Sequence, residues 1–268
     1  MKTHILDING KEKSIIEIPS FFYEIVREDI ISKILEAKKK VQPYSPSLMA
    51  GKQASAKGKL VHRRHVWKSQ YGRGMSRVPR KTMSKKGSQF NWVGAYAPQT
   101  RGGFRAHPPK IEARINTLKI NKKELILALK SALSATANEK MVLKKYKTFE
   151  GKKIKKEFPL VVEDKIVGLK TKEILKSLKD ILGEFYTVAI KKKTQRAGRG
   201  KIRGRRYKSN AGMLLVIGNK DKLKINAFDV IKVKDLSVTD LAKGGVGRLT
   251  VYTENAVKDL REKLGGRK

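Results

Sequence analysis

The chain has 268 residues, of which 63 are Lys or Arg and 24 are Asp or Glu, so its formal net charge is +39 at pH 7. This charge predicts a polyanionic partner, because phosphates release their counterions when Lys and Arg neutralise them. The absence of cysteine excludes disulfides, thiolate metal sites and cysteine nucleophiles. No apolar run reaches the roughly 18 residues of a membrane span, so we expect a soluble, cytoplasmic protein without a membrane partner.

The N-terminal residues predict two strands and a helix. Residues 3–8 and 14–18 have the composition of strands, and Asn9-Gly10 between them is typical of a tight turn. Residues 21–37 carry apolar side chains at helical spacing, and Ser20 is positioned to cap the start of that helix. The apolar residues on its expected buried face are Phe22, Ile25, Val26, Ile30, Ile34 and Leu35.

After residue 111, helices and short apolar strands alternate. Asn121 and Glu124 resemble a capping box at the start of one helix. Thr171 is positioned to cap a second helix, which Gly183 can end. The expected strands are 159–163, 185–190, 213–217, 227–233 and 249–252, and two further helices are expected at 237–241 and 253–264. This alternation favours an α/β fold, a Rossmann-like and mostly parallel sheet with helices on both faces. We expect one globular domain formed by residues 1–40 and 112–268.

Residues 41–111 have a different composition and interrupt that domain. The window 38–111 contains no Asp or Glu, six of the eight prolines and both tryptophans, and no helical or strand period is sustained in it. Such a segment buries too little apolar surface to offset the entropy lost when it orders. Because long loops in compact domains are usually functional, we expect an extended basic loop that becomes ordered on RNA.

Basic and aromatic residues alternate between Arg63 and Arg80 of this loop. Bases can stack on Trp67 and Tyr71 while the surrounding cations meet phosphates. The return arm, residues 90–96, could instead be a small apolar anchor that packs on protein. The residues of the loop that we expect to contact RNA are Lys52, Lys57, Lys59, Arg63, Arg64, Trp67, Lys68, Arg73, Arg77, Arg80, Lys81, Lys85, Lys86, Arg101, Arg105 and Lys110.

A second window without acidic residues runs from 185 to 220. Its glycines allow the backbone to turn sharply and to approach a phosphate closely. Arginine binds phosphates with two parallel hydrogen bonds or stacks on bases, and a tyrosine adds a flat face. A solvated charge run in a loop is the alternative explanation. The expected RNA-binding residues of this second loop are Arg196, Arg199, Lys201, Arg203, Arg205, Arg206 and Tyr207.

Patterns for catalysis or metal binding are weak. No GxxxxGK[ST] phosphate loop occurs, and Gly198–Gly204 has one residue too many for a dinucleotide fingerprint. A turn before the last strand explains Gly244–Gly247, and His62 and His65 have no third ligand nearby. Paired carboxylates, which we expect on solvated surfaces, occur at Glu28-Asp29 and Glu163-Asp164. We expect no enzyme, no cofactor and no metal. The rival hypotheses are an RNA-modifying enzyme on a Rossmann-like sheet and a DNA-compacting architectural protein.

Four stretches of the sequence, residues 63–81, 102–110, 121–137 and 195–207, together carry a family resemblance. They resemble the universal large-subunit ribosomal protein four, the L-four family, in its archaeal or eukaryotic form. The chain lacks the long basic C-terminal tail of many eukaryotic members, which favours the archaeal type. The similarity extends over nearly the whole sequence.

The resemblance implies more than the composition does. Members are structural proteins of the large ribosomal subunit, with an α/β domain on its outer side and a long loop that enters the rRNA. The tip of that loop helps to line the exit tunnel of the nascent peptide, opposite a protein of the L-twenty-two family. The implied partners are therefore large-subunit rRNA, neighbouring ribosomal proteins and the nascent peptide. By matching positions, the implied tunnel tip is formed by Gln70, Tyr71, Gly72, Arg73, Gly74, Met75, Ser76 and Arg77.

Overall fold

A computed structural model describes residues 2–39, 60–61, 63–95, 97–101, 107, 118–149 and 157–265 of the protein. The chain divides into two compact units. Met1–Lys39 and Ile120–Lys268 form the first, here named the α/β unit, and Lys40–Lys119 form the second, here named the loop unit. The expected domain boundaries at residues 40/41 and 111/112 fall outside the described residues and remain predictions. Among the described helices, none is both long and apolar enough to cross a bilayer.

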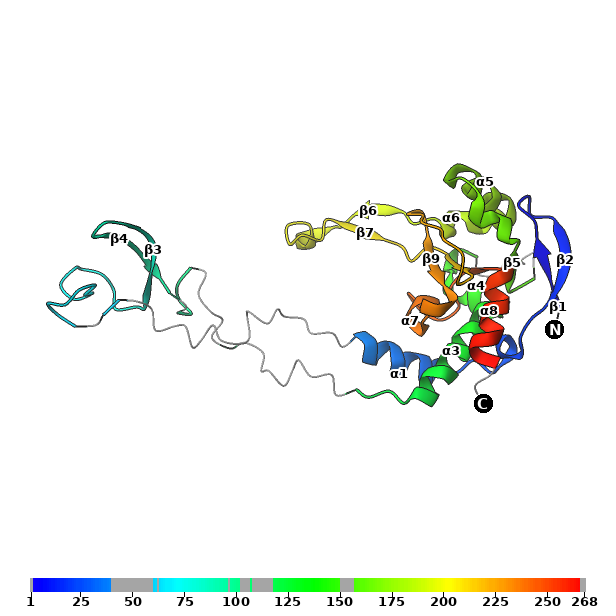
Figure 1. Cartoon of the computed structure of the whole chain (residues 1–268), viewed down its shortest axis with the longest axis horizontal. Coiled ribbons are helices and arrows are strands. Elements are labelled where there is room, and N and C mark those ends of the chain that lie inside the picture. The colour runs from blue at the N-terminus through cyan, green and yellow to red at the C-terminus, as the bar shows by residue number, and fades with distance from the viewer. Residues whose placement is uncertain are drawn as a thin grey trace. The chain divides into compact units, whose positions relative to one another are not determined.

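The α/β unit is built on a six-stranded sheet with the strand order β2-β1-β5-β10-β8-β9 (Figure 1). Its strands are β1 (Lys2–Leu6), β2 (Glu12–Glu17), β5 (Leu160–Val162), β8 (Leu214–Ile217), β9 (Asp229–Lys232) and β10 (Thr250–Thr253). Only β1 and β2 pair antiparallel, and every other neighbouring pair is parallel. In this register Val251 of β10 lies between Leu160 of β5 and Leu215 of β8. The expectation of a mostly parallel α/β sheet is therefore confirmed.

Helices of this unit connect the strands. The α-helices are α1 (Glu28–Lys39), α3 (Lys122–Ala137), α4 (Glu139–Lys145), α5 (Thr171–Leu182), α6 (Tyr186–Ala189), α7 (Val238–Leu241) and α8 (Glu254–Gly265). The 3-10 helices are η1 (Ser20–Tyr23), η4 (Lys147–Phe149), η5 (Asp164–Gly168), η6 (Gly183–Phe185), η7 (Gly198–Gly200) and η8 (Val233–Asp235).

The core consists of two apolar clusters, one on each face of the sheet. Leu214 and Val216 of β8 belong to the cluster that contains residues of α1, α3, α7 and α8. Leu215 and Ile217 of the same strand belong to the cluster that contains residues of α5 and α6. Because successive side chains of a strand point to opposite faces, a strand covered on both sides must be apolar at every position. This explains the uninterrupted apolar run of β8.

The helix predicted from residue 21 begins later than expected. Residues 20–23 form the 3-10 helix η1, and α1 begins only at Glu28. Between them, the backbone N–H of Arg27 donates to Ser131 Oγ at 2.6 Å, and the hydroxyl of Ser134 donates to the carbonyl of Glu24. These bonds to α3 satisfy backbone groups that helix hydrogen bonds would otherwise use. Ile25 is consequently 84% exposed, so its predicted place on the buried face of the helix is wrong.

Three capping predictions are wrong in detail. Ser20 is the first residue of η1, and the cap position of η1 is Pro19. Asn121 makes no capping hydrogen bond from its side chain, and Glu124 instead accepts from Lys33 Nζ of α1 at 3.0 Å. Thr171 is the first helical residue of α5 rather than its cap. The end of α5 is as expected, since Gly183 follows it with a positive φ of +54°. Tertiary contacts between helices therefore displaced the local cap at α3.

The strand predicted at 185–190 is also wrong, because these residues continue from η6 into α6. Phe185 and Ala189 are buried and lie four residues apart, which places them on the same side of a helical turn. The ring of Phe185 packs on that of Phe149 with their centroids 4.5 Å apart. A short apolar run fits a strand and a buried helical turn equally well, so this packing partner decides the conformation.

The loop unit contains regular structure that the sequence analysis did not predict. β3 (Arg80–Lys86) and β4 (Gln89–Gly94) form an antiparallel hairpin, with Gly87 in the turn at a φ of +57°. Phe90 and Trp92 alternate along β4, and the ring of Trp67 contacts Phe90 edge-on at 5.6 Å. The predicted absence of a sustained strand is therefore wrong for residues 80–94, where the rings of Phe90 and Trp92 contact each other and Phe90 also contacts Trp67.

Candidate nucleic-acid interface

The middle of the second acid-free window, residues 192–210, folds as a hairpin. β6 (Lys193–Gln195) pairs antiparallel with β7 (Tyr207–Ser209), and Figure 1 shows this hairpin extending away from the six-stranded sheet of the α/β unit. We name residues 192–210 the basic hairpin. All of them are exposed except the half-buried Gly200. The predicted RNA-binding residues of this window are thereby brought together on one protruding element, although the hairpin itself was not predicted.

Glycines shape the turn of the basic hairpin. Gly198 and Gly204 have φ values of +73° and +76°, a conformation that residues with a Cβ rarely adopt. Arg196 packs its side chain along Gly200, where a Cβ would lie 2.7 Å from Arg196 Cδ. Arg196 Nε also donates to the carbonyl of Arg205 at 3.1 Å. Arg196 thus contributes to the fold of the turn, besides carrying charge.

Two cations lie near the aromatic ring of Tyr207 at the start of β7. Lys193 Nζ lies 4.4 Å from the centroid of the Tyr207 ring, and Arg206 Cζ lies 5.7 Å from it. The ring is 45% exposed. A cation near the face of an aromatic ring is attracted to that face, so the two cations stabilise the orientation of the Tyr207 ring. Lys193 and Lys208 share this exposed surface but were not selected from the sequence, although their place in the acid-free window was a sufficient signal.

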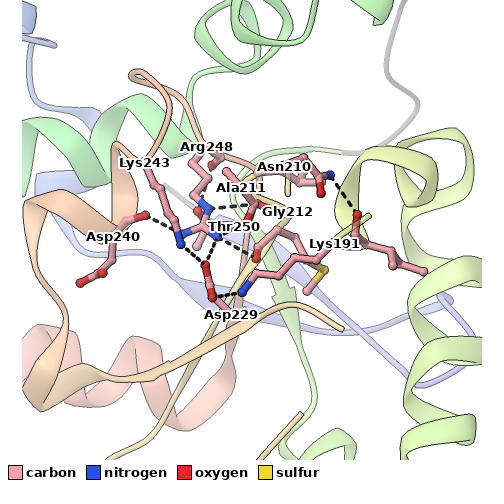
Figure 2. A network of polar contacts seen from close by, with 12 residues as sticks. Lys191, Asn210, Ala211, Gly212, Asp229, Asp240, Lys243, Arg248 and Thr250 are labelled. Carbon is pink, nitrogen blue, oxygen red and sulfur yellow. Dashed lines mark hydrogen bonds and ion pairs between the residues drawn. The ribbon is translucent and has the colours of Figure 1, made fainter. Parts of the chain in front are cut away.

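The root of the basic hairpin rests on a buried arginine (Figure 2). The guanidinium of Arg248 donates to the carbonyls of Ala211, Gly212 and Met213 at 2.8, 3.0 and 3.1 Å. It also donates to Asp229 Oδ2 at 2.6 Å. The side chain of Arg248 is fully buried. The chain segment that leaves the basic hairpin is therefore held by a planar group with fixed hydrogen-bond directions.

Asp229 at the start of β9 joins three cations. Lys191 Nζ donates to its Oδ1, while Lys243 Nζ lies 3.0 Å and Arg248 Nη2 lies 2.6 Å from its Oδ2. Burial by itself would raise the pKa of Asp229, but the hydrogen bonds from these cations hold that pKa well below its ordinary value. The carboxylate is therefore ionised at neutral pH. It links Lys191, which precedes the hairpin in the chain, to Arg248, which contacts the segment that follows the hairpin.

The predicted tip in the loop unit forms a closed turn. The side-chain amide of Gln70 donates to the carbonyl of Ser76 and, at 3.5 Å, to that of Val78. Gln70 is only 2% exposed, so it holds the turn from inside. Gly72 and Gly74 have φ values of +78° and +66° and let the backbone reverse. The structure thus brings residues 70–77 together in one compact turn.

Arginines of this turn also contact its own residues. Arg77 Cζ lies 5.1 Å from the centroid of the Tyr71 ring. Arg80 Nη2 donates to Ser76 Oγ at 3.0 Å and to its carbonyl at 3.3 Å. The side chain of Arg73 is exposed. Stacking of a base on Tyr71, which the sequence suggested, would therefore take place beside a guanidinium that already lies over the ring.

The other predicted residues of the loop are distributed as follows. Exposed residues are Arg63, Arg64, Trp67, Arg73, Arg77, Lys81, Lys85, Lys86 and Arg101, and half-buried ones are Lys68 and Arg80. Lys52, Lys57, Lys59, Arg105 and Lys110 lie outside the described residues. The ammonium groups of Lys68 and Lys85 lie 5.6 and 5.8 Å from the centroid of the Phe90 ring. Cations and aromatic rings are thus adjacent in both basic surfaces.

At the carboxyl edge of the sheet, where Rossmann-like enzymes bind nucleotide phosphates, two backbone N–H groups donate to the chain's own carboxylates. The backbone N–H of Asn255, in the first turn of α8, donates to Asp164 Oδ1 at 3.0 Å. The N–H of Asn219, after β8, donates to Asp259 Oδ2 at 2.7 Å. These N–H groups already have anionic partners, and those partners would repel a phosphate.

The carboxylate pairs differ from the expectation of solvated surfaces. The side chain of Glu163 is only 13% exposed and accepts from Lys13 Nζ at 2.7 Å, which lowers its pKa. Burial raises the pKa of Asp164. The solvated explanation does fit Asp29, an exposed group whose pKa Arg27 lowers to about 2. Within the described ranges no three His, Cys, Asp or Glu side chains are grouped to hold a metal, and His62 is outside those ranges.

Comparison with known proteins identifies the family. The model of the ribosomal protein L4/L1 family matches residues 16–263. The large ribosomal subunit protein uL4 of Archaeoglobus fulgidus is 38% identical over 98% of this chain and 100% of its own length. The same-named proteins of Sulfurisphaera tokodaii and Methanococcoides burtonii are 38% and 39% identical over at least 96% of both chains. The resemblance to the archaeal form is confirmed: this chain belongs to the ribosomal protein L4/L1 family, and it is a structural ribosomal protein rather than an enzyme.

Proposed function

We propose that this chain is a structural constituent of the large ribosomal subunit and binds its rRNA through two basic surfaces. One is the basic hairpin of the α/β unit, and the other is formed by the exposed cations of the loop unit. The observation that carries the proposal is the basic hairpin, an exposed element with many cations and no acidic residue of its own to neutralise them. A polyanion neutralises such an element without the cost of burying unpaired charge.

The chemistry of the basic hairpin fits folded RNA. Arg199 and Arg203 are exposed and can each bind a phosphate with two parallel hydrogen bonds. The glycines allow the backbone of the turn to approach the RNA closely. Tyr207 offers a flat face next to two cations, which suits an unstacked base beside its phosphate. These contacts position the protein on a folded RNA surface by shape and charge.

We also propose roles for the rest of the chain on the basis of its family. Residues 1–40 and 112–268 are the globular domain, and residues 41–111 are the loop that enters the rRNA. The turn at residues 70–77 helps to line the peptide exit tunnel, opposite a protein of the L-twenty-two family, and meets the nascent peptide there. The closed shape of this turn supports that role, since Gln70 stabilises it from inside. In this assignment the protein acts in subunit assembly and translation in the cytoplasm.

The test is the salt dependence of binding to large-subunit rRNA. If about ten phosphates are contacted, log K should fall with log salt with a slope of roughly −7 to −9. Changing Arg199, Lys201 and Arg203 to Gln should make the slope shallower by about 2 to 3, because each lost phosphate contact removes roughly 0.7 to 0.9. Arg196 is left unchanged because it stabilises the turn.

The matched control changes three exposed lysines of α5 to Gln, and it alters the net charge equally at a distance from the hairpin. These residues are Lys172, Lys176 and Lys179. The control should retain nearly the full slope of the unaltered protein. Equal slopes for the two triple variants would contradict the role of the hairpin, and a slope shallower than about −3 for the unaltered protein would contradict the proposal as a whole. Equal competition by duplex DNA would point to the rival DNA-compacting function.

A further inference from the structure

We propose that Asp229 and Arg248 are positioning residues that fix the direction in which the basic hairpin leaves the α/β unit. They thereby set its affinity for RNA without contacting the RNA themselves. This inference rests on the proposed RNA-binding function of the basic hairpin and goes beyond it. It assigns a role in recognition to the fully buried Arg248 and the half-buried Asp229, which lie at the root of the hairpin.

The basic hairpin has to be oriented from its root. Its strands pair only with each other, from Lys193–Ser209 to Gln195–Tyr207. The exposure of residues 192–199 and 201–210 shows that the rest of the unit does not cover them. The direction of such an arm is therefore decided where its two chain segments enter the core, before residue 192 and after residue 210.

Arg248 fixes the segment that leaves the hairpin. Its guanidinium donates to three consecutive carbonyls, those of Ala211, Gly212 and Met213. Gly212 has a φ of +65°, and a Cβ there would lie 2.9 Å from the carbonyl oxygen of Ala189. This close approach places the exit segment directly on the entry segment. The planar guanidinium allows little variation in the path of the exit segment.

Asp229 connects this anchor to the segment that enters the hairpin. Its carboxylate accepts from Lys191 on one oxygen and from Arg248 on the other (Figure 2). Asn210 adds a neutral link between the segments, since its side chain accepts from Lys192 N at 2.7 Å and donates to the carbonyl of Ile190 at 2.9 Å. The two segments are therefore joined on both sides of the root, and Asp229 is the shared acceptor.

A fixed root should strengthen RNA binding because the arm does not have to be ordered when it binds. This mechanism predicts an effect opposite to that of simple electrostatics. Changing Asp229 to Asn removes a negative charge, so electrostatics alone predicts tighter RNA binding. Loss of the root anchor predicts weaker binding, with a salt slope that stays the same because the phosphate-contacting cations are untouched.

The experiment measures rRNA binding by full-length Asp229→Asn, with Asp235→Asn as its control. Asp235 is exposed, and its substitution makes the same charge change. We expect the Asp229→Asn variant to bind about two- to tenfold more weakly than the control, as expected for coupled residues within one network. The Asp229→Glu variant should recover part of the loss because it keeps the carboxylate. Binding as tight as that of the control, or tighter, would overturn the inference.

A second measurement follows the hairpin directly, without RNA. Since the chain contains no cysteine, spin labels can be attached at two introduced cysteines, Ile202→Cys at the turn and Lys176→Cys on α5. Ile202 is 88% exposed and Lys176 is exposed, so the labels should not disturb the core. Pulsed electron resonance should give a broader distance distribution in Asp229→Asn than in the control, and equal widths would contradict positioning.

Two provisions keep the test decisive. If Asp229→Asn does not fold, Lys191→Gln provides a second variant, because it removes one link of the root and leaves the Arg248–Asp229 pair intact. Its distribution should also broaden relative to the control, and an unchanged width would count against the inference.

Failure of the proposed function has a different signature. In that case the triple Gln variant of the hairpin would bind rRNA like its α5 control, while the label distances would still report on the root.

Discussion

Lys145 illustrates how the environment of one residue changes its chemistry. Its ammonium group donates to the carbonyls of Lys243 and Gly245 at 3.0 and 2.9 Å. Burial, and secondarily the nearby charge of Arg248, lowers the pKa of Lys145 to about 7 from an ordinary value of 10.5. In the sequence this lysine looks the same as any other cation of a basic protein. In the structure the hydrogen bonds of Lys145 stabilise the turn at residues 243–247. The burial of its positive charge, by contrast, is unfavourable.

This lowered pKa predicts that stability rises with pH above neutrality. Between about pH 7 and 10.5 the unfolded state binds a proton at Lys145 that the folded state has lost, so raising the pH favours the folded state. The Lys145→Met variant should lack this contribution. Urea unfolding at pH 7, 8 and 9 measures it as the difference in free energy of unfolding between the variant and the unaltered protein. A difference that does not change with pH would show that Lys145 keeps its ordinary pKa.

At the scale of elements, α5 and its ending show how a local signal can suffice. Gly183 follows the helix with a φ of +54° and a ψ of −120°, a conformation available almost only to glycine. A Cβ placed there would meet no heavy atom within 4 Å. The requirement for glycine is therefore conformational and does not depend on neighbouring side chains. This is why its role could be predicted from sequence, whereas the cap at Asn121 could not.

Gly183→Ala should accordingly lower the free energy of unfolding by about 1 to 3 kcal/mol, the cost of holding a residue with a Cβ in this region. Gly168→Ala is the matched control. Gly168 ends η5 with an ordinary negative φ, and a Cβ there also meets open space. The control should be neutral, or stabilise by up to about 1 kcal/mol, because alanine restricts the unfolded chain. Similar losses for both variants, measured by urea unfolding, would contradict the conformational explanation.

The whole molecule consists of two units, and the α/β unit has its own core. Both apolar clusters that cover the sheet are formed entirely by residues of that unit. Within the loop unit, Gln70 stabilises the turn at residues 70–77, and the ring of Trp67 contacts that of Phe90. Each unit therefore has internal contacts that can stabilise it, and the described residues of the loop unit lie outside the two core clusters of the α/β unit.

Replacing residues 40–119 with a Gly/Ser linker of about ten residues should leave the α/β unit folded. Its free energy of unfolding should change by less than about 1 kcal/mol, because no described residue of the removed segment belongs to either core cluster. Far-ultraviolet circular dichroism in urea measures this change. The shortened protein should also keep the salt dependence that the basic hairpin contributes. Loss of cooperative unfolding would show that the division between the units is misplaced.

The fold could be predicted where burial follows directly from the local pattern. The apolar run of β8 indicated a buried parallel strand, and Ser237 correctly marked the start of α7. Prediction failed at residues 24–27, where α3 supplies the hydrogen-bond partners, and at residues 185–190, where Phe149 supplies the packing partner. The hairpin β6–β7 was missed because its exposed strands lack a clear alternation of apolar and polar residues. The short alternation of Phe90 and Trp92 in β4 was instead interpreted as a possible apolar anchor.

The sequence by itself determined the class of partner. Two acid-free, basic stretches within a chain of net charge +39 predict a polyanionic partner, whatever their conformation. Only the tertiary structure decided which cations are available to that partner. Arg203 is exposed, whereas Arg248 is buried and Lys191 is engaged at the root of the hairpin, although all three are equally basic in the sequence. The reason is that burial depends on contacts between residues far apart in the chain, such as Arg248 with Ala211, and no local pattern encodes such contacts.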